Sequence, residues 1–422
     1  MKRFQPHLLA LLMSCIAIPA VADSHYVLAG QMIDTLKGKV IQAPLVEIDG
    51  DKIIKVTANG TAPADAKVID LGAATLLPGL ADLHTHLTYN VTDFGYPGLA
   101  ISDTDQAISG VANARITLMA GFTSARNLGA SGYADVSLRN AIDAGKVPGP
   151  RLQVSGPSIG ATGGHCDNNL LPAKYDAVAD GVADGPWEAR KMVRRHAKYG
   201  ADVIKICATG GVLSKGTSPG ARQLTREEIE AIVDEAHNRG MKVAAHAHGT
   251  EGIRYAIDAG VDSIEHASLI DADGLKAAKK RGTFLSVNAY TPIFMLEKGA
   301  SVGMLPESLE KARQLKIQRF ETYRRAIKTG ANIVFGSDSA TYPHGDNART
   351  FAVYVELGMT PMQAIQSATT VAARSLGWEG KTGAIAPGYY ADMIAVAGNP
   401  LEDITELERV SFVMKGGEVF KR

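Results

Sequence analysis

Apolar and polar positions follow two different periods along most of the chain. From about residue 78 to residue 378, short apolar runs typical of buried strands are separated by segments with helical periodicity. These strand-like runs lie at 80–86, 122–127, 152–155, 203–207, 243–246, 263–266, 284–288 and 333–338. Such repeated strand–helix units predict an α/β fold, namely a (β/α)8 TIM barrel, with a doubly wound parallel sheet as the alternative.

Helix starts and loop lengths refine this prediction. Thr225-Arg226-Glu227-Glu228 and Thr360-Pro361-Met362-Gln363 both carry the capping pattern of a helix start, the second with proline at the first helical position. Loops at the carboxyl ends of barrel strands form the active-site face, so long loops there predict an enclosure for a substrate. The long connections lie at 156–185, 208–224, 289–306 and 339–347.

Both ends of the chain read as strands rather than as strand–helix units. Asp49-Gly50-Asp51 and Lys415-Gly416-Gly417 are turn signals between short β-like runs. Neither end can close a sheet alone, so we expect one small β-sandwich built from both. The expected domains are β-sandwich segments at 23–77 and 379–422 on either side of a barrel at 78–378.

The first 22 residues have the pattern of a secretory signal peptide, at 1–22. Lys2 and Arg3 precede an apolar run at 8–20, and Ala20-Val21-Ala22 is a small-residue cleavage site. The run is too short to span a membrane, and the lipoprotein-like box Leu12-Met13-Ser14-Cys15 is a weaker cleavage signal. We therefore expect an exported protein, periplasmic or secreted, with no membrane association after cleavage.

Charge and cysteine content narrow the partners and the redox state. Lys and Arg total 44, and Asp and Glu also total 44, which argues against nucleic acid or an anionic membrane surface as a partner. Cys15 would leave with the signal peptide. Cys166 and Cys207 could pair in an exported protein, but each lies in a glycine-rich motif, and we expect both to be reduced neighbours of an active site.

Polar residues end several of the apolar runs. His84 and His86 are one residue apart, so both side chains leave the same face of a strand. An isolated pair of this kind is more often structural than metal-binding. Later runs add further polar residues, which together reverse that balance: Lys205, His246, His266 and Asp338.

The donor types of this set indicate a site for two metal ions. Burial of Lys205 among Val203, Ile204 and Ile206 lowers the pKa of its amine. A neutral amine can take up CO2 and become a carbamate, which is a bridging carboxylate. Imidazoles, a carbamate and the Asp338 carboxylate suit a pair of borderline divalent ions, zinc first. Taken singly, each residue is more often a hydrogen-bonded core group, or a snorkelling lysine.

Five motifs hold these residues: Leu83-His84-Thr85-His86-Leu87, Lys205-Ile206-Cys207-Ala208-Thr209-Gly210-Gly211, His246-Ala247-His248-Gly249, Ile264-Glu265-His266-Ala267 and Gly336-Ser337-Asp338. With them the chain resembles the amidohydrolase superfamily in its binuclear form with a carboxylated lysine. Within it, the chain is similar to exported prolidase-like members, which include Xaa-Pro and Xaa-Arg dipeptidases and ochratoxin-hydrolysing amidases. The resemblance covers nearly the whole chain after the signal peptide.

The resemblance implies a mechanism and a role for each residue. A hydroxide shared by two metal ions would attack an amide carbonyl, and Asp338 would pass its proton to the leaving amine. The expected catalytic residues are Asp338, His165 and His266. The expected ligands are His84, His86 and Asp338 for one ion, His246 and His266 for the other, and carboxylated Lys205 as the bridge.

Substrate contacts are expected from the loops. His165 would stabilise the oxyanion by donating to the substrate carbonyl; alternatively it is a loop histidine bonded to backbone. Relatives usually have glycine in place of Cys166, which leaves the shape of this loop open. The other candidates are His248, alternatively a metal ligand, Tyr290, alternatively a packed aromatic, and Arg222.

The leading hypothesis is a metal-dependent hydrolase that frees a C-terminal amino acid from dipeptides or N-acyl amino acids such as ochratoxin A. A second is a mononuclear deaminase or imidazolonepropionase-like hydrolase of cyclic amides, and a third is a non-catalytic scaffold. Lys205 argues against the second, which would lack a bridging lysine, and the complete ligand set argues against the third. The resemblance also implies a homo-oligomer.

Overall fold

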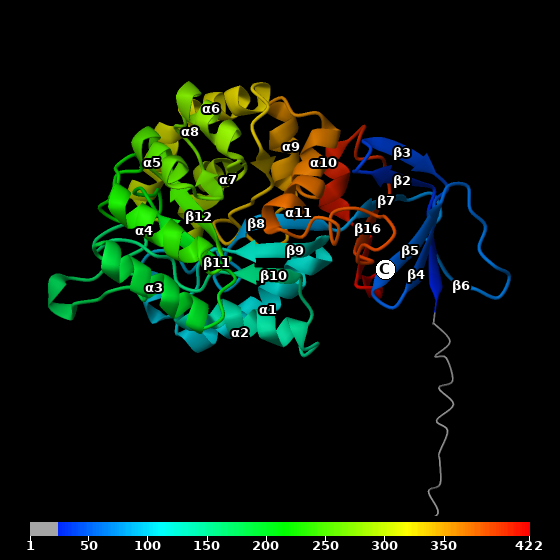
Figure 1. Cartoon of the computed structure of the whole chain (residues 1–422), viewed down its shortest axis with the longest axis horizontal. Helices are drawn as coiled ribbons and strands as arrows, with labels where there is room; N and C mark the ends of the chain where they lie inside the picture. Colours follow the sequence, from blue (N-terminus) through cyan, green and yellow to red (C-terminus); the bar gives the residue numbers. More distant parts are fainter. Residues whose placement is uncertain (1–23) are drawn as a thin grey trace, which may run out of the picture.

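The computed structural model describes residues 24–422. Sheets at one end of the molecule stand beside a larger part in which helices surround parallel strands (Figure 1). The signal peptide expected at 1–22 lies outside the described residues. Between residues 24 and 422, no helix is long and apolar enough to cross a lipid bilayer.

Strands from both ends of the chain build two sheets. The first has the strand order β5-β4-β1-β6, and the second has the order β18-β17-β16-β7-β2-β3, which combines strands from both ends. Within the second sheet, β7 connects the strands of the two chain ends, because it pairs in parallel with β2 and antiparallel with β16. The strands are β1 (His25–Leu28), β2 (Gln31–Asp34), β3 (Lys39–Gln42), β4 (Leu45–Asp49), β5 (Lys52–Thr57), β6 (Lys67–Asp70), β7 (Thr75–Pro78), β16 (Met393–Val396), β17 (Phe412–Lys415) and β18 (Glu418–Lys421).

The two sheets share one apolar core. Val27, Ile48 and Ile53 of the first sheet belong to the same buried cluster as Met393 and Phe412 of the second. Alternating side chains point to opposite faces of a strand, so one face of each sheet can pack inward. Both predicted turns are present, between β4 and β5 and between β17 and β18.

Parallel strands form the centre of the larger part, in two ladders of order β10-β9-β8 and β11-β12-β13-β14-β15. Backbone hydrogen bonds link the edges of the ladders: Leu83 N donates to Phe335 O (3.0 Å), and Cys207 N donates to Ile159 O (2.8 Å). The strands therefore follow one another in chain order, with their carboxyl ends on one face. They are β8 (Leu80–Thr85), β9 (Phe122–Asn127), β10 (Arg151–Val154), β11 (Val203–Cys207), β12 (Lys242–Ala247), β13 (Ser263–His266), β14 (Phe284–Ser286) and β15 (Ile333–Val334).

Helices cover these strands (Figure 1). Both predicted capping boxes are present, with Thr225 at the start of α4 and Thr360 at the start of α10. The helices are α1 (Asp103–Met119), α2 (Ala134–Asp143), α3 (Pro186–Lys198), α4 (Arg226–His237), α5 (Thr250–Ala259), α6 (Ala272–Arg281), α7 (Thr291–Lys298), α8 (Pro306–Lys328), α9 (Arg349–Glu356), α10 (Pro361–Ser367) and α11 (Thr370–Leu376).

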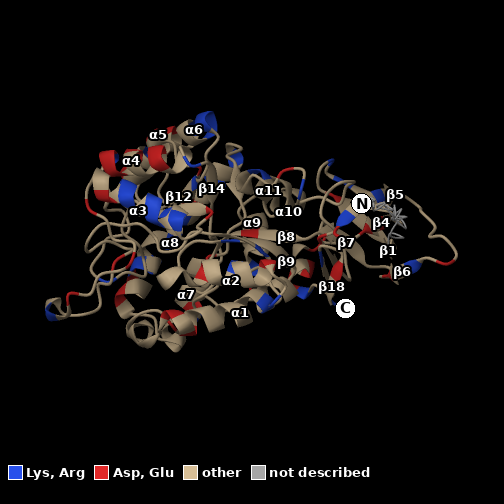
Figure 2. Ribbon diagram, turned by 60° about the horizontal axis from the view of Figure 1, so that its bottom comes forward, with Lys and Arg blue, Asp and Glu red and all other residues tan. Residues whose placement is uncertain are grey.

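Several predicted boundaries are wrong, among them that of the strand predicted at 284–288, which ends at Ser286 as β14. The segment 289–306, predicted as a loop, contains α7 and the 3-10 helix η4 (Gly299–Val302). The last predicted strand, 333–338, is shorter in the structure, where β15 ends at Val334; the chain runs on beside β8 to Asp338, which has a left-handed backbone with φ 64°. Lys and Arg residues are frequent on the α3 ribbon, and Asp and Glu residues on that of the neighbouring α4 (Figure 2); between these helices, Arg194 contacts Glu235 at 2.9 Å.

Candidate metal centre

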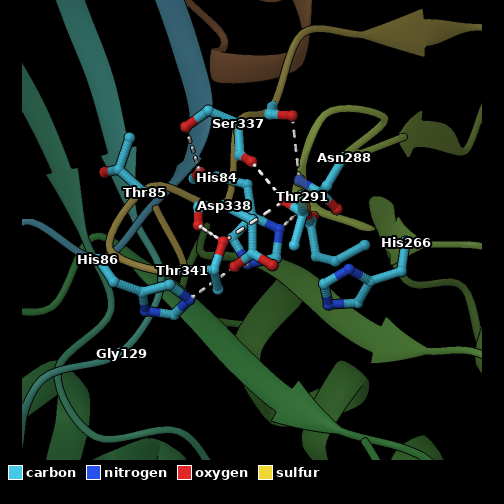
Figure 3. A network of polar contacts seen from close by, with 12 residues as sticks. His84, Thr85, His86, Gly129, His266, Asn288, Thr291, Ser337, Asp338 and Thr341 are labelled. Atoms are coloured by element: carbon cyan, nitrogen blue, oxygen red, sulfur yellow. Dashed lines mark hydrogen bonds and ion pairs between the residues drawn. The ribbon is translucent and has the colours of Figure 1, made fainter. Parts of the chain in front are cut away.

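All of the predicted metal ligands meet at the carboxyl ends of the central strands. Strands that run parallel around a centre bring residues far apart in the sequence to one face. Figure 3 shows His84, His86 and Asp338 pointing toward one another, with His266 to one side. The ligands are His84 on β8, His86 just beyond it, Lys205 on β11, His246 on β12, His266 at the end of β13 and Asp338 after β15.

His84, His86 and Asp338 form the first set of candidate ligands. One ligand atom of each lies within 4.8 Å of the others. Asp338 Oδ1 lies 3.4 Å from His84 Nε2 and 3.3 Å from His86 Nε2. Burial would raise the pKa of Asp338, but the two imidazoles hold it below its usual value. The ionised carboxylate and two imidazole nitrogens therefore suit a divalent cation.

His246, His248 and His266 form the second set, and their ligand atoms also lie within 4.8 Å of one another. Burial lowers the pKa of all three well below the usual value for histidine. The rings are therefore neutral at pH 7 and offer nitrogen lone pairs. The sequence placed His246 and His266 as ligands and His248 as a substrate contact, whereas the geometry brings His248 as close as the other two.

Lys205 lies beside the first set, with Nζ 3.5 Å from His84 Nε2 and only 3% of the residue exposed. Burial lowers the pKa of Lys205 to about 8, although Glu265 and Asp338 oppose this effect. About a tenth of such an amine is neutral at pH 7, and the neutral form is the one that reacts with CO2. The donor atoms thus fit two divalent ions, one at each set, with Lys205 as a candidate bridge.

Arg126 and Glu265 form a buried pair that the sequence reading missed. Arg126 Nη2 donates to Glu265 Oε1 (2.7 Å), Ser263 Oγ donates to the same oxygen (2.6 Å), and Glu265 Oε2 lies 3.0 Å from His84 Nδ1. Burial would raise the pKa of Glu265, but Arg126 and His84 hold it well below its usual range. The negative charge of this carboxylate, 3.0 Å away, favours a proton on His84 Nδ1, which leaves Nε2 for a metal. The sequence did carry a signal for this pair, since each of the two predicted strands contains one charged residue.

Three further hydrogen bonds hold the backbone at the site. Asp82 Oδ1 accepts one from the backbone N–H of Ser337 (2.9 Å), and Asp82 Oδ2 accepts one from Asn347 Nδ2 (2.7 Å). These bonds tie β8 to the segment that carries Asp338. On the opposite side, Tyr323 Oη donates to His266 O (2.7 Å) from α8.

His165 lies against the second set, with its ring centroid 4.1 Å from that of His246. Its backbone N–H donates to Gln223 Oε1 (2.7 Å). Burial, followed by the charge of Lys205, lowers the pKa of His165 to about 3. The neutral ring has one N–H to donate, so the position and protonation state are compatible with the predicted contact to a substrate carbonyl.

Two other predicted substrate contacts, Tyr290 and Arg222, bind side chains of the protein itself. Tyr290 is nearly buried, and its hydroxyl accepts a hydrogen bond from Arg349 Nη1 (3.0 Å). Arg222 is exposed, pairs with Glu251 (3.1 Å) and lies over the ring of Tyr255 (5.0 Å). The structure thus places Arg222 in a surface ion pair, and both roles stay predictions.

The expectation that Cys166 and Cys207 are reduced is wrong. The two residues form a disulfide, with Cα atoms 6.0 Å apart. The loop after β10 returns to the end of β11, which a reading of each cysteine within its own motif could not show. Both cysteines do lie next to the site, because Cys207 ends the strand that carries Lys205.

Comparison with known sequences agrees with this geometry. The model of the amidohydrolase family matches residues 75–420. Ochratoxinase from Aspergillus niger is 37% identical over 374 residues, a match that covers 82% of this chain and 75% of that protein.

Solved structures give the same result. A Xaa-Pro dipeptidase with methionine bound in its active site is 38% identical, with a TM-score of 0.89 over 94% of this chain and 100% of that chain. A prolidase complexed with N-methylphosphonate-L-proline is 32% identical, with a TM-score of 0.86 over 94% of this chain and 100% of that chain. The fold is therefore an α/β fold of the kind found in these TIM-barrel hydrolases, with a sheet region from both ends of the chain.

Proposed function

The chain belongs to the amidohydrolase family and is a metal-dependent hydrolase of carbon–nitrogen bonds, and on that premise we propose that it uses two zinc ions to free a C-terminal amino acid from dipeptides or N-acyl amino acids. The observation that carries the proposal is the pair of donor sets at the carboxyl ends of the strands, with Lys205 beside the first set. Bound there, the ions would polarise the amide carbonyl and lower the pKa of the attacking water.

The two donor sets need a shared anionic ligand, and Lys205 is suited to supply it. Addition of CO2 to the neutral amine forms an N–C bond and releases one proton, which leaves a carbamate anion. The low pKa of the buried amine favours this reaction. The proposed ligands are His84, His86 and Asp338 for one ion, His246 and His266 for the other, and the Lys205 carbamate for both.

Asp338 would transfer the proton, and His165 would stabilise the negative charge that develops on the carbonyl oxygen. Asp338 is an ionised carboxylate at neutral pH, so it can accept a proton from the attacking water and deliver it to the amine nitrogen as the C–N bond breaks. Neutral His165 would donate its N–H to the carbonyl oxygen, on which negative charge develops. The water oxygen ends in the new carboxylate, and the water protons end on the products.

The proposed substrate class rests on the relatives. One is an ochratoxinase, one is a Xaa-Pro dipeptidase with methionine bound in its active site, and one is a prolidase complexed with a proline derivative. An amino acid and a proline derivative in these structures support a C-terminal amino acid as the leaving group.

A library of Xaa–Yaa dipeptides and N-acyl amino acids, incubated with the zinc-loaded protein, tests this proposal. We expect release of the C-terminal amino acid, and loss of that release in Asp338→Asn, which keeps the size of the side chain but removes the proton acceptor. Hydrolysis that is equal in Asp338→Asn and wild type would contradict the assignment of the site. Turnover of cyclic amides alone would contradict the substrate class.

Metal content separates the two-ion reading from the mononuclear deaminase or imidazolonepropionase-like alternative. We expect two ions per chain after mild chelation and reloading with zinc. A stoichiometry of one, with full activity, would instead favour the mononuclear alternative, in which Lys205 has no bridging role.

We further propose the finer architecture and the location. Hydrogen bonds across both edges of the parallel ladders support a closed (β/α)8 barrel near 78–378, and the shared core of the terminal sheets supports a β-sandwich from 23–77 and 379–422. The disulfide supports an oxidising compartment, in line with export to the periplasm or medium. A homo-oligomer is proposed from the family resemblance.

A further inference from the structure

The disulfide joins the loop after β10 to the strand that carries Lys205. In the first part of this loop, Ile159 N donates to Lys205 O (2.8 Å), so the chain runs beside β11. It then leaves β11 and comes back with Ala183 N donating to Gly160 O (2.9 Å). Cys166 lies on the excursion between these points, and its bond to Cys207 pins the middle of the loop to the end of β11.

His165 is the residue next to the pinned position. Its ring lies against His246, with centroids 4.1 Å apart, and any side chain on Gly211 would collide with the ring. Hydrogen bonds also hold this part of the loop, such as His165 N to Gln223 Oε1 (2.7 Å) and Thr162 N to Asp184 Oδ1 (3.0 Å), and Ala161 packs against the core. The Thr162 bond involves exposed residues, where water competes with protein partners.

We propose that the Cys166–Cys207 disulfide is a positioning device that holds the His165 imidazole over the metal centre. The inference rests on the proposed function in one respect, because His165 affects turnover only if the site hydrolyses amides. Precise placement of a hydrogen-bond donor matters for rate more than for substrate binding, since the charge it stabilises develops during the reaction. Loss of the disulfide should therefore lower kcat and leave KM nearly unchanged.

Reduction is a reversible way to remove the clamp. A water-soluble phosphine takes up the oxygen of one water and becomes a phosphine oxide, and its two electrons with the two protons of that water convert the disulfide into two thiols. A phosphine is preferred to a dithiol, because a dithiol also binds zinc. The same loss should follow from the double substitution Cys166→Ala and Cys207→Ala.

The decisive test compares two backgrounds. In the wild-type background, the double cysteine substitution should lower kcat about 10- to 100-fold, with two zinc ions still bound per chain. In the His165→Ala background, adding the cysteine substitutions should change kcat by less than about twofold, because the group that they position is already absent. Thr162→Ala is the matched control; it removes the hydrogen bond from Thr162 Oγ1 to Asp184 Oδ2 (2.5 Å) in the same loop and should change kcat little.

Each other outcome overturns the proposal. An unchanged kcat without the disulfide, or an equal loss in both backgrounds, would mean that the disulfide does not act through His165. Loss of zinc in the cysteine variant would mean that it acts through Lys205 instead.

A second measurement keeps the inference testable even if no amide substrate is found. Hydrogen exchange of the peptide that covers 161–169 should become faster after reduction, while that of β12 stays unchanged. Unchanged exchange in 161–169 would overturn the clamp itself, independently of what the site hydrolyses.

Discussion

Replacement of Glu265 by glutamine should weaken metal binding although every predicted ligand remains in place. Glu265 Oε2 lies 3.0 Å from His84 Nδ1, and Glu265 Oε1 accepts from Arg126 (2.7 Å) and Ser263 (2.6 Å). A glutamine amide has one acceptor oxygen. If that oxygen serves Arg126 and Ser263, the NH2 group faces His84 Nδ1, which must then lose its proton and move it to Nε2. That nitrogen is the one needed for the metal.

The expected size of the effect follows from the role of the carboxylate. Loss of a residue that orients a metal-bound histidine typically weakens metal affinity 10- to 100-fold, which corresponds to about 1.4–2.7 kcal/mol. The substitution also leaves the Arg126 guanidinium, 2% exposed, without its counter-charge. Breaking a buried ion pair in this way costs about 3–5 kcal/mol of folding stability.

Chelator competition measures the zinc affinity, and urea denaturation of the metal-free protein measures stability. Glu235→Gln is the matched control, because Glu235 also contacts arginine (Arg194 at 2.9 Å), but on the outer helices. The control should keep the wild-type zinc affinity. If Glu265→Gln binds zinc as tightly as wild type, or if the control weakens binding equally, the assigned role of Glu265 is wrong.

Three further predictions concern single residues. Lys205→Ala removes the proposed bridging anion, so it should bind fewer than two ions per chain and hydrolyse its substrate at least 100-fold more slowly. Added formate should restore part of the activity, whereas full activity without formate would count against the bridge. His248→Asn should raise KM while two ions stay bound, whereas loss of an ion would identify His248 as a ligand, as its place in the second set allows. His196, fully buried on α3, accepts from Tyr133 Oη at Nδ1 (3.0 Å) and donates from Nε2 to Pro157 O (2.7 Å); burial lowers its pKa from 6.5 to about 4. Between pH 4 and 6.5 the unfolded chain therefore binds more protons than the folded chain. The contribution of neutral His196 to the free energy of unfolding is present above pH 6.5 and falls by about 3 kcal/mol toward pH 4. In urea titrations the free energy of unfolding of His196→Gln should depend less on pH than that of wild type, and an equal dependence would refute the assignment.

Much of the fold could be predicted because its elements are regular. Three of the central strands, β9, β11 and β13, have the predicted bounds; each begins one to three residues after a glycine, at Gly121, Gly200 and Gly260. α7 was missed because its sequence directly follows a predicted strand. The helix packs against α8, a contact that the local sequence pattern does not reveal. β15 is shorter than predicted because the backbone turns at Gly336-Ser337-Asp338 to bring Asp338 to the site, and local sequence does not encode that turn.

In the candidate site, too, the sequence predicts some residues and not others. Residues at strand ends, such as His84, could be predicted because strand polarity alone decides where they meet. Arg126 and Glu265, 139 positions apart in the chain, could not be paired from the sequence, since their contact depends on the order of β9 and β13 around the centre. The disulfide was missed for a related reason, because Cys166 reaches Cys207 only after the loop folds back on β11.

The central claim is that this chain holds two metal ions bridged by Lys205. An anomalous difference map, collected at the zinc edge from crystals of the zinc-loaded protein, tests it most directly. We predict two peaks, one among His84, His86 and Asp338 and one between His246 and His266, with density for a carbamate on Lys205. A single peak, or two peaks with an unmodified Lys205 that touches neither, would contradict the account.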